Sequence, residues 1–152
     1  HDGKYQIVDP PKEEFEDVSK NFVPTQPPPP PPELTFEEQK QAKLSDLRDL
    51  RFNRQMEGVT YKGHPFNGDP LTLNAFMSAI LAAGDENFVV IWKDANGDFL
   101  ELERSDMVAA VKLIRELTQA CFNNEYRLSK IINAAADPRA LAKVNITAGW
   151  PA

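Results

Sequence analysis

The residues of this chain that could take part in catalysis are few and lie far apart in the sequence. His64 lies next to Pro65 in an expected turn, where a surface histidine is more usual than a lone general base. Cys121 lies on an apolar helical stripe, which favours a buried cysteine over a reactive one. Glu101 and Glu103 share a strand face, and nothing distinguishes them from solvated carboxylates. We therefore predict that the chain is not an enzyme and has no catalytic residue.

The sequence also lacks the ligand patterns of metal and cofactor sites. It has two histidines and one cysteine, with no HxxxH or HExxH spacing. Residues 94–98 (Asp-Ala-Asn-Gly-Asp) begin like a calcium loop, but Phe99 and Ser105 occupy the positions where that loop requires glycine and glutamate. No glycine-rich phosphate or dinucleotide motif occurs. We expect neither a metal nor a cofactor.

The negative charge of the chain is concentrated in its first part. The 152 residues carry a net charge of −6, and residues 1–34 hold three lysines against seven acidic residues. Without a basic cluster, the chain is a poor match for nucleic acid, whose affinity depends on phosphate neutralisation, and for an anionic membrane surface. No apolar run approaches the ~20 residues of a transmembrane helix, and we expect no signal peptide. We predict no nucleic-acid partner and no membrane insertion.

Six consecutive prolines at positions 27–32 divide the chain. Each proline lacks an N–H and fixes φ, so the run favours polyproline II and forms a stiff spacer of about 18–20 Å. Composition therefore predicts three parts. They are an extended acidic arm at residues 1–26, a polyproline spacer at 27–34 and a small α+β domain at 35–152.

The arm carries scattered apolar residues among its acidic ones. Its composition favours disorder, and the alternative is that it becomes ordered when these residues bind a partner. A basic groove would suit its charge. The residues expected to anchor the arm are Tyr5, Ile7, Phe15, Val18, Phe22 and Val23.

The first half of the domain predicts a helix followed by a hairpin. Thr35 and Glu38 form a capping box in front of a helix at 36–56. Residues 59–66 are β-branched or aromatic around a Lys62-Gly63 turn, which is typical of a tight hairpin.

A second helix and a second hairpin follow. Asp69 is a good N-cap for a helix at 70–83, whose apolar residues recur at helical spacing. Strands at 88–92 and 99–102 flank Asn96-Gly97, a strong hairpin signal.

The last part predicts a long helix and a short tail. Ser105 and Asp106 are expected to cap a helix that runs to about residue 136, either continuous or interrupted at 123–124. Asp137-Pro138 begins one more helical turn. The fold class is therefore α+β, with long helices packed against two short β-hairpins and preceded by the arm and spacer.

Two helical stripes are candidate surfaces. Arg48, Arg51 and Arg54 form a basic stripe that is either salt-bridged and solvated or a docking surface for an acidic partner. An apolar stripe of roughly heptad spacing on the long helix either mediates self-association or packs against the helix at 36–56. Its members are Val111, Ile114, Cys121, Leu128 and Ile132.

Three segments resemble a known family. They are Gly58 to Phe66, Trp92 to Asp98 with the strand at 100–102, and the ending Ile146 to Pro151. In this order they are similar to a family of uncharacterised domains encoded in the tail-fibre regions of tailed bacteriophages and in prophages, over about residues 44–150. The resemblance implies a virion or virion-assembly role, and the family has no established catalytic residues to carry over.

The resemblance and the organisation of the chain lead to one expected function and two alternatives. We expect a structural component of a bacteriophage tail, a tail fibre or fibre-attachment protein, that docks through its arm on other tail or fibre subunits and can form homo-oligomers. It would be made in the host bacterial cytoplasm and reside in the virion tail. The first alternative is a tail-fibre assembly chaperone. The second is a receptor- or carbohydrate-binding module for host attachment, in which Trp92, Trp150 or Tyr61 stacks on a sugar.

Overall fold

A computed structural model describes residue 3 and residues 23–152 of the chain. The chain divides into two units, residues 1–33 and 34–152, and each is considered by itself. In the first unit, residues 23–33 form neither helix nor strand and are exposed. The expected anchors Tyr5, Ile7, Phe15, Val18 and Phe22 lie outside the described residues, whereas Val23 is 80% exposed.

The second unit begins with the helix α1, Phe36–Met56. The Thr35 hydroxyl accepts from the Glu38 amide at 3.3 Å, and the Glu38 carboxylate accepts from the Thr35 amide at 2.7 Å. This capping box satisfies two N–H groups that the first helical turn would leave unpaired. The helix therefore starts where the local sequence places it.

The first hairpin pairs β1, Val59–Tyr61, with β2, His64–Phe66. Its turn residues Lys62 and Gly63 have φ values of 48° and 82°. A type I′ turn needs positive φ at both central positions, which explains the glycine. Before the hairpin, Gly58 is required for space, because a Cβ there would overlap the carbonyl oxygen of Phe66.

The helix α2, Pro70–Ala83, and the second hairpin follow. Asp69 caps α2 by accepting from the Thr72 amide at 2.8 Å. The strands β3, Val89–Lys93, and β4, Phe99–Glu103, pair antiparallel around the Asn96-Gly97 turn.

The helix α3, Arg104–Ala134, is the longest element, and α4, Pro138–Ala142, follows it. One local expectation is corrected here. The N-cap is Glu103, whose amide donates to the Asp106 carboxylate at 3.0 Å, so Asp106 lies inside the first turn. Of the two alternatives at Asn123-Asn124, the structure has the continuous helix.

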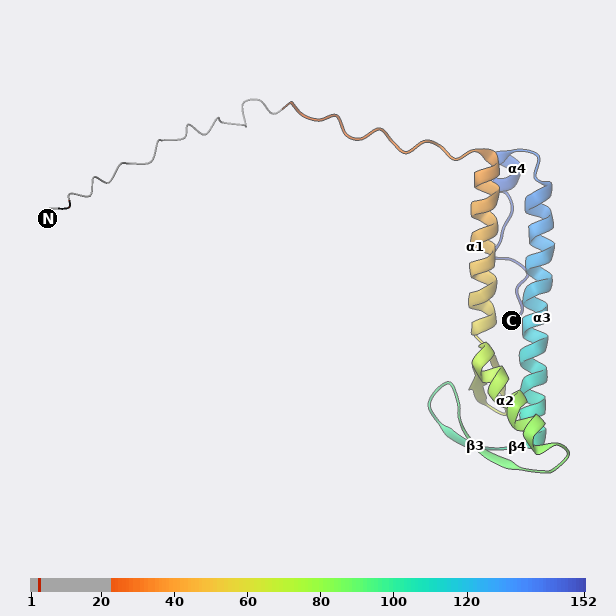
Figure 1. Ribbon diagram of the computed structural model, residues 1–152. Coiled ribbons are helices and arrows are strands. Elements are labelled where there is room, and N and C mark those ends of the chain that lie inside the picture. The colour runs from red at the N-terminus through yellow and green to blue at the C-terminus, as the bar shows by residue number, and fades with distance from the viewer. Residues whose placement is uncertain (1–2, 4–22) are drawn as a thin grey trace. The chain divides into compact units, whose positions relative to one another are not determined.

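Two apolar clusters lie along α3, and the expected α+β fold of long helices and two short hairpins is confirmed. Figure 1 shows α1 and α3 side by side, with α2 and the β3–β4 hairpin gathered near the start of α3 and α4 near its end. The first cluster joins the hairpins and α2 to α3 around Phe76 and Met107. The second joins α1, α3 and α4 around Leu47, Ile132 and Leu141.

No helix in the described part of the chain combines the length and the apolar character that crossing a bilayer would require.

The second cluster yields a stability prediction. Leu47 is 1% exposed, so Leu47→Ala should lower the free energy of unfolding by about 2–5 kcal/mol through lost burial and the cavity left behind. Leu71→Ala makes the same chemical change at a side chain that is 79% exposed and should have an effect within about 0.5 kcal/mol. Urea unfolding followed by circular dichroism compares the two, and equal effects would contradict the packing described.

Candidate functional site

The polar side chains of the first hairpin meet two carboxylates in one place. Tyr61, Lys62 and His64 come from β1, β2 and their turn, Asp94 from the β3–β4 turn, and Asp106 from the first turn of α3. We call these five residues the hairpin latch. Four of them, all except Asp94, line a hollow of about 280 Å³ together with Leu100, Glu101 and Leu102.

Asp106 is the centre of one half of the latch. One of its oxygens accepts from the Lys62 ammonium at 2.7 Å and from the Tyr61 hydroxyl at 3.0 Å. The other accepts from the Glu103 amide at 3.0 Å. The carboxylate is buried and therefore needs these donors, since an unpaired buried charge is costly. It ties the hairpin to the start of α3.

Asp94 is the centre of the other half. One oxygen lies 2.9 Å from His64 Nδ1, and the other accepts from the amides of Asn96 and Asp98, both at 2.9 Å. The Ala95 amide donates to the Pro65 carbonyl at 2.9 Å. These contacts fix the shape of the β3–β4 turn and attach it to β2.

The charge states of the latch are set by its hydrogen bonds. The Lys62 hydrogen bond holds the pKa of Asp106 below its usual range, and the His64 hydrogen bond does the same for Asp94. Asp106 in turn raises the pKa of Tyr61 and of Lys62 through the hydrogen bonds that it accepts. At neutral pH the carboxylates are ionised, Lys62 is charged and Tyr61 keeps its proton, so these four groups are poorly matched to proton transfer near pH 7.

The latch has part of a catalytic arrangement and lacks the rest. A carboxylate that orients a histidine is one component of a nucleophile-activating triad. Among the described residues that line the hollow, there is no serine, threonine or cysteine to be activated. Cys121 lies elsewhere, fully buried in α3, and burial raises the pKa of its thiol. Its placement is that of a structural cysteine.

Metal ligation has little support in the same region. Both oxygens of Asp94 already accept hydrogen bonds from His64 or from backbone amides. Within residue 3 and residues 23–152, no group of three or more His, Cys, Asp or Glu side chains is arranged to hold a metal ion.

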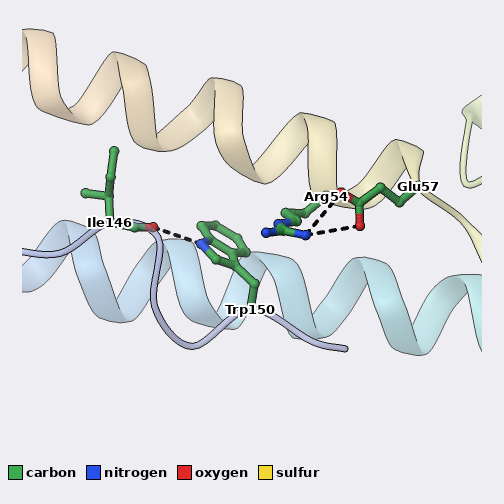
Figure 2. Close-up of polar contacts among 4 residues, drawn as sticks. All are labelled: Arg54, Glu57, Ile146 and Trp150. Atoms are coloured by element: carbon green, nitrogen blue, oxygen red, sulfur yellow. Dashed lines mark hydrogen bonds and ion pairs between the residues drawn. The ribbon is translucent and has the colours of Figure 1, made fainter.

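The Gly-Trp-Pro ending is also built into the fold. The Trp150 indole N–H donates to the Ile146 carbonyl at 2.8 Å, and Figure 2 shows the indole beside the Arg54 side chain between α1 and α3. Arg54 pairs with Glu57 at 3.1 Å, while its buried Nε has no hydrogen-bond partner among the described residues. The side-chain amide of Asn124 donates to the Ala148 carbonyl at 3.0 Å. The tail is thus tied to α3 and covers the α1–α3 seam.

The three aromatic residues considered for sugar stacking have structural contacts. Trp92 packs on Phe76 with ring centroids 4.4 Å apart, and Tyr61 donates to Asp106. Trp150 packs against the second apolar cluster. Each is partly buried, which leaves these side chains little of the open aromatic face that a sugar needs.

The apolar stripe of α3 faces the interior of the chain. Val111 belongs to the first cluster and Leu128 and Ile132 to the second, while Ile114 and Cys121 are buried between them. Packing within one chain accounts for the whole stripe. These five residues are therefore not an exposed surface for a second copy in this fold.

The basic stripe of α1 is largely salt-bridged. Arg51 donates to Glu125 on α3 at 3.0 Å and to Gln55, and Arg54 pairs with Glu57. Arg48 is exposed, and the described residues give it no ion pair. The stripe mainly links α1 to Glu125 on α3 and to Glu57 at the C-terminal end of α1.

The latch was not foreseen as a unit. Sequence reasoning treated Asp94 as a turn residue and Asp106 as a helix cap, both of which are local roles. Their partners in the first hairpin lie 30 to 45 positions away along the chain. The local signal was an aspartate shortly after each strand of the second hairpin.

Comparison with known proteins gives one family. A family model described as a domain of unknown function (DUF4376) matches residues 38–148. Searches of curated proteins and of solved structures gave no match.

The latch predicts acid sensitivity of a definite sign. Both carboxylates have lowered pKa values in the fold, so their stabilisation is complete above the unfolded value of about 3.8 and is lost as the pH falls through the folded values. The urea midpoint should fall steeply as the pH drops below about 4. Asp106→Asn should lower the midpoint at pH 7 and flatten that fall.

A matched control uses Asp85→Asn, which removes an exposed carboxylate outside the latch. It should leave the steep acid-dependent loss in place. A pH profile of Asp106→Asn that is parallel to that of the unaltered chain would contradict the role given to this carboxylate.

Proposed function

The chain belongs to the DUF4376 family of domains of unknown function, and we propose that it is a structural component of a bacteriophage tail. In this proposal it is a tail fibre or fibre-attachment protein that docks on other tail or fibre subunits through its N-terminal arm. It is made in the host bacterial cytoplasm and resides in the virion.

One observation supports a structural rather than a catalytic role. The polar residues of the segments that resemble phage tail-region domains are bound to other groups of the same fold. Asp106 fastens the first hairpin to α3, Asp94 fastens the β3–β4 turn to the first hairpin, and Trp150 closes the α1–α3 seam. Residues kept for catalysis are commonly left with a reactive atom facing a cavity, whereas these stabilise a rigid module.

The assignment to a phage tail rests on the resemblance of the three segments at 58–66, 92–102 and 146–151. The organisation of the chain supports attachment as its task. A rigid domain follows a proline run, which in turn follows an acidic arm with spaced apolar residues. Such an arm can be ordered by a partner, and a stiff spacer sets its distance from the domain.

The two alternatives differ in their support. A carbohydrate-binding module is disfavoured by the partly buried positions of Trp92, Trp150 and Tyr61. A fibre-assembly chaperone shares every feature above and differs only in leaving the particle, so an observation on particles separates it from the structural component.

Mass spectrometry of purified particles of the phage that encodes this chain tests the proposal. Peptides from residues 35–152 should be present at a constant ratio to a known tail protein. Absence of the chain from particles that still carry fibres would contradict a structural role and favour the chaperone.

Deletion of residues 1–26 provides a second test on particles. The shortened chain should remain folded in the lysate and be missing from particles, because the proposed docking element is gone. Incorporation at the unaltered ratio would contradict docking through the arm.

A further inference from the structure

A groove lies between the second half of α3 and the segment that follows it. Two hollows of about 330 and 440 Å³ share Ile131, Ala140 and Val144 in their walls and are therefore continuous. Most of the remaining wall is alanine and leucine. Ile131 is 44% exposed although it lies in an apolar surrounding. We call this feature the α3–α4 groove.

The surroundings of the groove are basic, in contrast to the rest of the chain. Arg127 and Lys143 line it directly. Residues 126–152 contain four basic side chains and one acidic one, Asp137, whereas the whole chain carries −6. The Asp137 carboxylate accepts from the Ala140 amide at 2.7 Å. An apolar trough with a positive rim suits an acidic segment that carries apolar side chains.

Charge separates this groove from the exposed apolar surface of the second hairpin. The outer face of the β3–β4 hairpin exposes Val89, Ile91 and Phe99. Glu101 and Glu103 lie opposite Ile91 and Val89 in the register, so that face is acidic in part. An acidic partner would be repelled there and attracted at the groove.

The arm of this chain has the composition that the groove fits. Residues 13–18 read Glu-Glu-Phe-Glu-Asp-Val, with four carboxylates around Phe15 and Val18. The eleven residues 24–34 contain seven prolines and can span up to about 34 Å at the polyproline II rise. The stiff proline run resists the sharp reversal of the chain that residues 13–18 would need to reach the groove of their own domain. Binding to the groove of a neighbouring molecule is therefore favoured.

We propose that residues 13–18 of one copy bind the α3–α4 groove of a second copy. The contact is head-to-tail, so repetition produces a ring or an open chain of copies. This proposal rests on the proposed function, in which the arm is the docking element. It adds that one partner of the arm is a second copy of the chain. Phe15 and Val18 fill the apolar trough, and the carboxylates face Arg127 and Lys143.

Sedimentation velocity of the full chain over a range of concentrations tests the contact. The unaltered chain should associate with increasing concentration, and less so in 0.5 M NaCl because the charges are exposed and screened. Arg127→Glu/Lys143→Glu should weaken association about tenfold or more. Glu13→Lys/Glu16→Lys should do the same.

The decisive sample is an equimolar mixture of these two double variants. In the mixture, reversed arms meet reversed grooves and unaltered arms meet unaltered grooves, so hetero-association should recover to near the unaltered level. Circular dichroism and a thermal melt establish that each variant is folded. The matched control is Arg48→Glu/Lys93→Glu, which makes the same charge change on α1 and β3 and should leave association unchanged.

Three results would overturn the proposal. They are a monomer at every concentration, association that resists both double variants, and failure of the mixture to recover. Loss of association in the Arg48→Glu/Lys93→Glu control alone would also overturn it. The particle experiment is independent: a chain that is missing from particles but associates in this way contradicts the tail assignment and leaves the groove contact standing.

Discussion

The packing of α3 against the rest of the domain is the interaction on which the structure depends. One face of this 31-residue helix buries the side chains that hold both apolar clusters, and its two ends serve different partners. The hairpins and α2 pack near its start, while α1, α4 and the tail pack near its end. A two-stranded hairpin is barely stable alone, so both hairpins need this helix as a support. The domain is therefore a single rigid body organised by one element.

The latch places polar contacts where apolar packing cannot fix the arrangement. Burial alone would hold the small hairpins loosely, because hydrophobic contact is not directional. Asp106 and Asp94 add directed hydrogen bonds between the first hairpin, the second turn and α3. The hydrogen bonds of these carboxylates are all used to hold parts of the fold together. This is why we assign a structural role to a cluster that includes an aspartate–histidine pair.

Local signals predicted the elements well and the long-range contacts poorly. The start of α1 followed from its capping box, and both turns followed from their glycines, Gly63 and Gly97, because each is decided within a few residues. The sequence left the continuity of α3 through Asn124 open, since the side-chain amide of Asn124 has its partner in the distant tail carbonyl of Ala148. The latch was missed for the same reason. Packing of the apolar stripe of α3 against α1 was one of two alternatives from the sequence, and the structure adds the first hairpin, α2 and α4 as further partners.

In the proposed role, the domain is a module stabilised by its polar residues, and the acidic arm connects it to neighbours in a phage tail. Electron cryomicroscopy of the intact particle tests this claim most directly. We expect density for the domain of residues 35–152 in the tail, with residues before the proline run ordered against a neighbouring subunit. A tail in which the domain is present but attached through another surface, with no density for the arm at any contact, would contradict it.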